Sequence, residues 1–421
     1  MNLARRILKF IKSFNYFECE LNQPTVLMGY QGEDLLHYFD INKDNFICST
    51  TKRPISFKIF LVAIILFFKT ALLRPVLFFK TLRWFHTIYF ICAYLKLKKT
   101  TCLISFTDYN PLPIYIKKTL DKKIKTIGIQ NSRRENRLKH SNFDYYYLLT
   151  PLRAEEKINF DECKTYEFGS LRLLLSINEN ELWEEINKTP DHNVAPVDFI
   201  LISSLTHDFL NFIDVNLDEK FDPVNLKFKI SKLFEKYNEN KKNFRELRFL
   251  NFLILCEYIT DYVKSKKDNI IVLSRTEPDS LDHFREKKFY NKFSNIQFKC
   301  LHKIDKYNFI TSKKNGIFVS DISTLSRECL SINMKCVFFN YYIKYTGDYW
   351  TVNNAIFYSN KEKKKDFYFR LDNIKLINKV NFMFEKNKIK KESCIIPSSR
   401  KKLEDFLKIS NLKLRYNNVK I

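Results

Sequence analysis

Short apolar runs alternate with longer segments of helical spacing along most of this chain. In the first half, each apolar run predicts a strand that ends in small or polar residues. These predicted strands are Thr25–Met28, Thr101–Phe106, Lys125–Ile129, Tyr145–Leu149 and Thr165–Phe168, with a predicted helix over Pro111–Leu120. Strands that alternate with helices predict a parallel sheet with helices on both faces.

A second series of the same kind follows a polar and acidic stretch over 176–196, where we place a domain junction. Its predicted strands are Phe199–Ser203, Asn269–Leu273, Ile296–Cys300, Gly316–Ser320, Lys335–Phe339 and Ala355–Tyr358, and Phe244–Lys264 is a long amphipathic helix. We therefore expect an N-terminal domain over 1–180, a second domain over 196–385 and a basic tail or helix over 386–421. Two α/β domains in one chain are expected to form a cleft between them.

The most informative segment is 315–341, which predicts a strand, a polar turn, a short helix over Leu325–Ile332 and a second strand. A helix that follows a parallel strand directs its unpaired N–H groups to the carboxyl edge of the sheet, where phosphate binds. Ser323 and Thr324 stand at the start of this helix. Glu328 lies about one turn further in, where a carboxylate can accept hydrogen bonds from a ribose. The alternative is an ordinary β-α-β step with a well-capped helix.

Candidate site residues follow the predicted strands, because ligands of α/β sheets bind beyond the carboxyl ends of strands. In the first domain they are Asp108, Gln130, Asn131, Ser132 and Arg172. Asp108 is the best carboxylate for general-base or nucleophilic chemistry. Its alternative role is the N-cap of the following helix.

The second domain also contains candidate site residues, one of them cationic and the others able to titrate. Arg275 is a candidate for binding a phosphate group of the ligand with two N–H groups, or else for an ion pair with Glu277. Glu286 and Tyr290 lie four residues apart and share one helix face. That face either lines the pocket for the phosphate-bearing ligand or is solvated. His207 is a candidate acid or base, or an ordinary loop histidine.

Composition narrows the class of protein. The 421 residues are 45% hydrophobic, enough for two cores, while only 6 glycines leave no glycine-rich phosphate loop. The formal charge of +25 favours an anionic partner, although AT-rich codon usage also raises the lysine content. The 10 cysteines form no CxxC pair and are expected to be buried thiols in a reducing compartment. Neither cysteines nor histidines have metal-ligand spacing, so no metal is expected.

Residues 56–95 are the most hydrophobic part of the chain. The apolar run Ile59–Phe68 is too short to span a bilayer, and Arg74-Pro75 predicts a break between two helices. Lys58, Lys69 and Lys80 recur on nearly one helical face. This pattern is typical of interfacial helices, or of helices that are packed in the core with one wet face. We expect a cytoplasmic protein attached peripherally to an anionic membrane surface, at the inner face of the cytoplasmic membrane.

Two strings in the first half, Gly128–Ser132 and Phe168–Arg172, resemble the first domain of GT-B glycosyltransferases that build bacterial surface polysaccharide, including capsule and O-antigen enzymes that use Kdo. The later string SDISTLSRECLSINMKCVFFN resembles their donor domain. The resemblance implies a GT-B fold of two Rossmann-like domains facing a cleft, with Ser323, Thr324 and Glu328 on the donor nucleotide. It also implies that Asp108 or the Gln130–Ser132 loop lies near the reacting carbon.

This chain departs from the family at two places. Ser132 stands where relatives often have glycine, and the donor loop lacks the glycines that many members place against a diphosphate. The donor is therefore a UDP-, GDP- or CMP-sugar.

The resemblance implies a metal-independent glycosyltransferase that moves a sugar, hexosyl or Kdo, from a nucleotide-sugar to a growing, lipid-linked surface glycan. One alternative is a teichoic-acid-type polyol-phosphate transferase, which the scarcity of histidine disfavours. Another is a non-catalytic basic protein that binds nucleic acid. Most aromatic residues lie inside apolar runs, so no nucleic-acid partner is expected.

Overall fold

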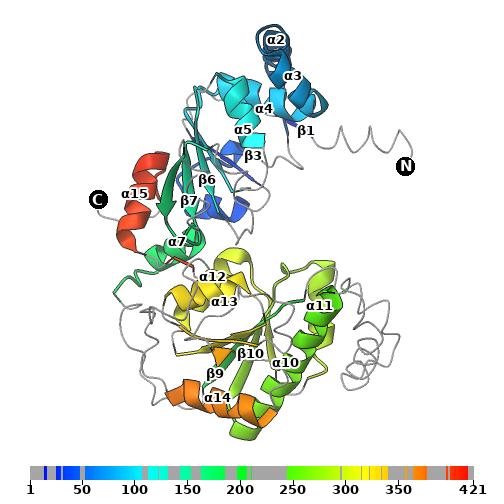
Figure 1. Cartoon of the computed structure of the whole chain (residues 1–421), viewed down its shortest axis with the longest axis vertical. Helices are drawn as coiled ribbons and strands as arrows, with labels where there is room; N and C mark the ends of the chain where they lie inside the picture. The colour runs from blue at the N-terminus through cyan, green and yellow to red at the C-terminus, as the bar shows by residue number, and fades with distance from the viewer. Residues whose placement is uncertain are drawn as a thin grey trace, which may run out of the picture. The chain divides into compact units, whose positions relative to one another are not determined.

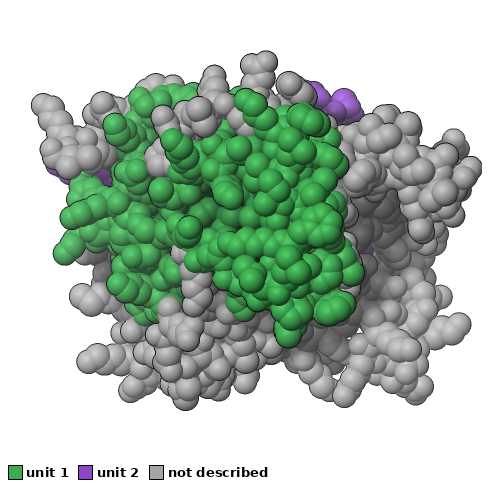
Figure 2. Space-filling view, turned by 90° about the horizontal axis from the view of Figure 1, so that it is seen from above, with its two compact units in different colours: residues 1–179, 398–421 green, residues 180–397 purple. Residues whose placement is uncertain are grey.

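The protein was analysed as a computed structural model, which describes residues 14–16, 25–29, 32–47, 53–106, 112–121, 123–130, 143–152, 163–184, 197–205, 210, 244–293, 296–313, 315–321, 323–332, 334–339, 356–357, 364–376, 395–396 and 399–415. The chain divides into two compact units, residues 1–179 with 398–421, and residues 180–397. Figure 2 shows the described residues of the first unit in green, seen from above.

The first unit is built on a parallel sheet of six described strands in the order β3-β2-β5-β6-β7-β8. The strands are β2 (Thr25–Met28), β3 (Phe46–Ile47), β5 (Cys102–Ser105), β6 (Lys125–Ile129), β7 (Tyr145–Leu148) and β8 (Lys164–Glu167). A separate parallel pair is formed by β1 (Phe14–Tyr16) and β4 (Arg53–Ile55). The central strands are almost wholly buried, as expected for a parallel sheet that is covered on both faces.

Helices of the first unit pack on both this sheet and one another. They are α2 (Phe57–Leu73), α3 (Pro75–Thr81), α4 (Phe85–Leu97), α5 (Leu112–Thr119), α7 (Leu171–Glu179) and α15 (Arg400–Ser410), with 3-10 turns η1 (Glu33–His37), η2 (Lys43–Asn45) and η3 (Leu82–Trp84). The central helix of this group is α4, whose residues 88–95 are all buried in one apolar cluster with β2 and β5.

Helix α15 joins the first unit from the other end of the chain, beside α7 (Figure 1). Its Phe406 ring lies against Phe39, Tyr147 and Phe168. The carbonyl of Ser410 accepts a hydrogen bond of 3.0 Å from the Thr25 hydroxyl. Part of the segment 386–421, for which we expected a basic tail or helix, therefore contributes a helix to the first core.

The second unit has a parallel sheet of six described strands in the order β11-β10-β9-β12-β13-β14. The strands are β9 (Asp198–Ile202), β10 (Asn269–Leu273), β11 (Ile296–Lys299), β12 (Ile317–Ser320), β13 (Lys335–Phe338) and β14 (Ile356–Phe357). The described helices are α10 (Phe244–Lys266), α11 (Leu281–Tyr290), α12 (Lys303–Ser312), α13 (Thr324–Ser331) and α14 (Lys364–Leu376).

One face of the second sheet is covered by α10 and α14. Tyr262 of α10 contacts the ring of Phe199 on β9 and that of Tyr368 on α14. Strand residues that point to this face, such as Leu201 and Val272, are fully buried in the same cluster. Helix α13 packs along β12 and β13, where the Cys336 thiol donates a hydrogen bond to the carbonyl of Ser326.

The predicted fold class is confirmed: the protein is α/β, with two Rossmann-like parallel sheets, the two-domain composition of a GT-B-like fold. The predicted break at Arg74-Pro75 is present, because α2 ends at Leu73 and α3 begins at Pro75. The expectation of two helices over 56–95 is wrong, since η3 interrupts the segment again before α4. Among the described helices, none combines the length and apolar character that a membrane span requires.

Candidate functional site

The strand order of the second sheet indicates where a ligand is expected to bind. From β9 the chain adds β10 and β11 on one side, then returns to add β12, β13 and β14 on the other. This is the doubly wound order 3-2-1-4-5-6, in which ligands bind at the carboxyl edge where the direction of winding reverses. In this protein the reversal lies between the neighbouring strands β9 and β12.

Buried polar residues close the two strands at this point. Ser203 and Ser204 follow β9, while Ser320 ends β12 and Asp321 follows it. The Ser204 hydroxyl donates a hydrogen bond to the Asp321 carboxylate, and all four residues are almost fully buried. These residues form a buried polar floor at the carboxyl edge of the sheet, where a carboxylate is bound to a hydroxyl of the adjacent strand.

Helix α13 begins at Thr324, directly beyond this floor, with Ser323 as its N-cap in extended conformation. The Ser323 side chain makes no capping hydrogen bond, and both residues are partly exposed. Ser326, in the first turn, donates a 2.7 Å hydrogen bond to the Ser320 hydroxyl and so ties the helix to β12. A helix start that its N-cap side chain does not satisfy, at the switch point of a doubly wound sheet, suits a phosphate group.

Glu328 lies one turn into α13 and is nearly buried. Its Oε2 accepts a 3.0 Å hydrogen bond from the hydroxyl of Tyr307, which belongs to α12. This bond fixes the carboxylate beside the helix start. The sequence pattern predicted Glu328, Ser323 and Thr324 as a group, and the structure places them on one short helix at the switch point. Tyr307 was missed, because nothing in its local sequence connects it to Glu328.

A second polar cluster surrounds Glu286, beyond the end of β10. Its Oε2 accepts hydrogen bonds from the hydroxyls of Ser274, at 2.5 Å, and Thr276, at 2.7 Å. Glu286 is fully buried, and its Oε1 has no hydrogen-bond partner among the described residues. Tyr290, one turn further on, is equally buried and donates a 2.8 Å hydrogen bond to the Ser203 hydroxyl. The alternative of a solvated helix face is therefore wrong for these two residues.

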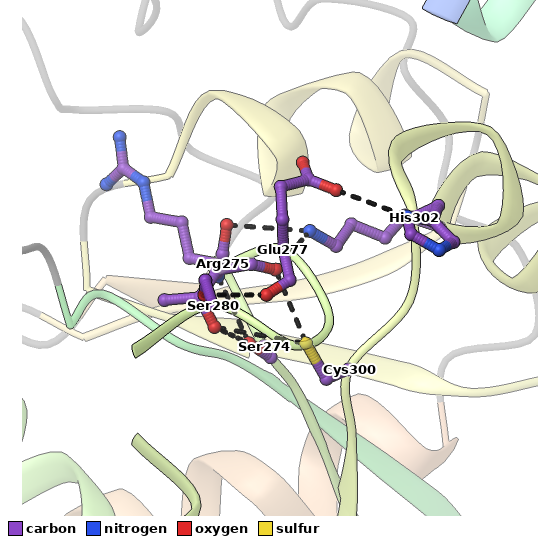
Figure 3. A network of polar contacts seen from close by, with 8 residues as sticks. Ser274, Arg275, Glu277, Ser280, Cys300 and His302 are labelled. Atoms are coloured by element: carbon purple, nitrogen blue, oxygen red, sulfur yellow. Dashed lines mark hydrogen bonds and ion pairs between the residues drawn. The ribbon is translucent and has the colours of Figure 1, made fainter. Parts of the chain in front are cut away.

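Figure 3 shows the loop after β10. The Lys306 ammonium donates hydrogen bonds to the carbonyls of Arg275, at 3.4 Å, and Thr276, at 2.9 Å, and burial lowers the pKa of this lysine. Glu277 lies 3.6 Å from His302 Nδ1, whereas the Arg275 side chain extends away from Glu277 (Figure 3). The expected alternative of an Arg275–Glu277 pair is wrong. Arg275 is exposed at the carboxyl edge of β10, next to the switch point.

In the first unit, two candidates are held in internal contacts. The Gln130 side-chain oxygen accepts a 2.9 Å hydrogen bond from the Leu149 N–H, which links the ends of β6 and β7. Arg172 binds Asp34 with two N–H groups, at 2.6 and 3.1 Å, and both side chains are largely buried. Sequence reasoning missed Asp34, which belongs to the 3-10 turn η1 far from Arg172 in the chain.

Four candidates, Asp108, Asn131, Ser132 and His207, lie outside the described residues. Within the part of the chain that the structure describes, no group of His, Cys, Asp or Glu side chains is placed to hold a metal ion. The described cysteines are free thiols, all buried except the partly exposed Cys300.

No protein-family model matches this chain, and no curated protein matches its sequence. Solved structures of similar fold include the UDP-GlcNAc 2-epimerase of Neisseria meningitidis bound to UDP-GlcNAc, at 11% identity over 91% of this chain and 99% of that one, with a TM-score of 0.44. The enzyme of the same name from Methanocaldococcus jannaschii, in complex with UDP-GlcNAc and UDP, aligns at 13% identity over 76% and 78% of the two chains, with a TM-score of 0.42. The wall teichoic acid polymerase TagF aligns at 11% identity over 86% and 79%, with a TM-score of 0.38. These similarities concern the fold alone.

Proposed function

We propose that this protein is a glycosyltransferase that moves a sugar from a nucleotide-sugar donor to a growing, lipid-linked surface glycan at the inner face of the cytoplasmic membrane. The observation that carries the proposal is the start of α13 at the switch point of the second sheet, with Glu328 fixed one turn beyond it. Two parts of a nucleotide match this site, because the N–H groups at the helix start can bind phosphate and the carboxylate can accept hydrogen bonds from ribose hydroxyls.

In this proposal the donor phosphate binds at the N–H groups of Ser323 and Thr324. Glu328 accepts hydrogen bonds from the ribose, and the exposed guanidinium of Arg275 approaches the phosphate from the end of β10. As the glycosidic bond to phosphate breaks, negative charge grows on the departing nucleotide. A helix start and a cation stabilise that charge without a metal ion.

The polar cluster around Glu286 has a supporting role in this scheme. By accepting hydrogen bonds from Ser274 and Thr276, Glu286 fixes the loop that carries Arg275. The reacting centre requires a base for the acceptor hydroxyl, since glycosyl transfer proceeds through an oxocarbenium-like state that the acceptor attacks. Asp108 and His207 are the candidates for that role.

The test is nucleotide binding by thermal shift. A ligand at a hundred times its Kd stabilises the folded state by about 2.7 kcal/mol, so UDP, GDP or CMP should raise the melting temperature measurably. Glu328→Ala should abolish that shift and leave the ligand-free protein folded. Asp305→Ala removes an exposed carboxylate of α12 and serves as the matched control, with an unchanged shift. A full shift in Glu328→Ala would refute the donor site.

The transfer step is tested separately, by the nucleotide released from candidate donors. Asp108→Asn should bind the nucleotide as the wild type does and lose turnover. Release of a nucleoside monophosphate from a nucleoside-diphosphate polyol, with no turnover of any nucleotide-sugar, would replace glycosyl transfer by polyol-phosphate transfer.

A further inference from the structure

Helix α2 carries an unusual second apolar stripe. Phe57, Leu61, Ile65, Phe68 and Leu72 follow one another at intervals of three or four residues, so they lie along one face of the helix. All five side chains are exposed, with exposed fractions between 45% and 82%. Single exposed apolar residues are ordinary on proteins, but a continuous stripe of five marks a binding surface.

The opposite face of α2 already supplies its packing. Ile59, Ala63 and Leu66 are buried in one cluster with α4 and the strands β2 and β5. A helix that is apolar on both faces is normally buried on both sides. Among the described residues the outer stripe adds nothing to the first core, so its apolar character points to a contact with another surface.

Helix α3 and the turn η3 continue the exposed surface. Val76, Phe79, Leu82 and Trp84 are all exposed, the first two by about two-thirds or more. In Figure 1, α2 and α3 lie side by side beyond α4. Together the exposed apolar side chains of α2, α3 and η3 form what we call the α2–α3 surface. A tryptophan at its edge is typical of side chains that lie at a membrane–water boundary.

The charge of this region restricts the partner. Residues 57–97 contain four lysines, two arginines and no acidic residue. Lys69 and Arg74 are held by Asp121, which follows α5, and the hydrogen bond from Lys69 in particular keeps the pKa of Asp121 below its usual value. Lys58 and Lys80 are exposed beside the apolar stripe. A surface that is apolar at its centre and carries exposed lysines at its edges, beyond the pair that Asp121 neutralises, matches an anionic lipid bilayer.

A second copy of the chain fits less well. In a two-fold symmetric dimer the same surface meets itself, and the described carboxylate beside it, that of Asp121, is already bound by Lys69 and Arg74 of the same copy. The 17 residues of α2 extend about 25 Å, and no described helix qualifies as a membrane span. The helices therefore suit a position along the bilayer surface, with the apolar stripe in the acyl boundary and the lysines among the headgroups.

We propose that the α2–α3 surface docks this protein on anionic lipid bilayers, with helix α2 lying in the plane of the interface. The docking surface belongs to the first unit and does not depend on the proposed donor site. A failure of nucleotide binding therefore leaves this proposal standing, and the reverse also holds.

The experiment is flotation of the full-length protein with vesicles of phosphatidylcholine, with and without phosphatidylglycerol. The wild type should float with anionic vesicles. The double variant Ile65→Glu/Phe68→Glu should bind about 100-fold more weakly, because two exposed apolar side chains no longer enter the bilayer. Lys58→Glu/Lys80→Glu should lose about tenfold or more on anionic vesicles and bind neutral vesicles as the wild type does.

Phe284→Glu and Phe369→Glu are the matched controls, because both remove an exposed phenylalanine, one from α11 and one from α14 of the second unit. Both should float as the wild type does. Light scattering without lipid should show the same mass for the wild type and the Ile65→Glu/Phe68→Glu variant. Wild-type flotation of that variant would overturn the proposal. So would a lipid-free dimer that the two substitutions dissociate.

Discussion

Lys335 is a buried cation at the start of an otherwise apolar strand. It is the first residue of β13, and its ammonium donates a 2.9 Å hydrogen bond to the carbonyl of Lys375 at the end of α14. Burial lowers the pKa of Lys335 from 10.5 to about 8. The folded state therefore carries the cost of a buried charge below that pH, and the cost fades as the pH rises toward the unfolded value.

Replacing this lysine should stabilise the protein in a pH-dependent way. We expect Lys335→Met to raise the free energy of unfolding at pH 7 by about 1–2 kcal/mol, since the desolvation cost removed exceeds the one hydrogen bond lost. The gain should shrink as the pH rises from about 8 to 10.5. Urea unfolding of the variant and the wild type at both ends of this pH range measures the difference in the free energy of unfolding. Lys287→Met, at an exposed position of α11, should show no such trend, and a gain for Lys335→Met that is equal at every pH would contradict the assignment.

At this scale the sequence located one part of the site and missed another. Ser323, Thr324 and Glu328 were predicted because a strand and the helix that follows it lie next to each other in the chain, and their local order alone sets the geometry. The bond between Tyr307 and Glu328 joins two separate helices, and the pairing of Arg172 with Asp34 joins residues far apart in sequence. Such partners depend on tertiary packing, which no local pattern encodes.

The carboxylate of Asp144 connects a helix and two strands of the first unit. Asp144, just before β7, accepts hydrogen bonds from the Thr126 N–H at 2.8 Å, the Thr126 hydroxyl at 2.9 Å and the Lys117 ammonium at 2.6 Å. Partial burial raises the pKa of Asp144, but the hydrogen bonds from Lys117 and Thr126 outweigh it and hold the pKa below its usual value. The side chain thus links α5, β6 and β7.

The acid stability of the first unit should depend on this link. A carboxylate with a lowered pKa contributes stability above the unfolded value, about pH 3.9, and loses that contribution as the pH falls through the folded pKa. Asp144→Asn should therefore be less stable than the wild type at pH 7, with a difference that disappears in acid. Thermal unfolding of both proteins between pH 2 and 7, in steps of about one pH unit, tests this expectation. Asp40→Asn, on an exposed aspartate of the same unit, should match the wild type throughout.

Strands were predicted better than helices. Thr25–Met28, Lys125–Ile129 and Asn269–Leu273 have the same bounds in the sequence prediction and in the structure, because fully buried parallel strands are short apolar runs bounded by polar residues. The additional break at η3 was missed, since residues 82–84 carry neither proline nor glycine.

At the scale of the whole molecule, the first unit is closed by a segment more than 200 residues away in the chain. Helix α15 inserts Phe406 between Phe39, Tyr147 and Phe168. Beyond the helix, the Arg415 N–H donates a 2.9 Å hydrogen bond to the Tyr38 carbonyl. The sequence showed a basic segment at this position and no sign of where it packs, because the apolar residues of α15 predict a buried face but not the surface that covers it.

This closure predicts a defect confined to one unit. Phe406→Ala should reduce the free energy of unfolding of the first unit by about 3–5 kcal/mol, the usual cost of removing a buried ring and leaving a cavity. Hydrogen exchange should become faster in β2 and β5–β8 and stay unchanged in β9–β13, because the rings that Phe406 contacts belong to the first core. Phe369→Ala removes an exposed phenylalanine of α14 and should leave exchange in both sheets as in the wild type. Equal acceleration in both sheets by Phe406→Ala would mean that the two units unfold as one, and that α15 stabilises the whole chain rather than the sheet it contacts.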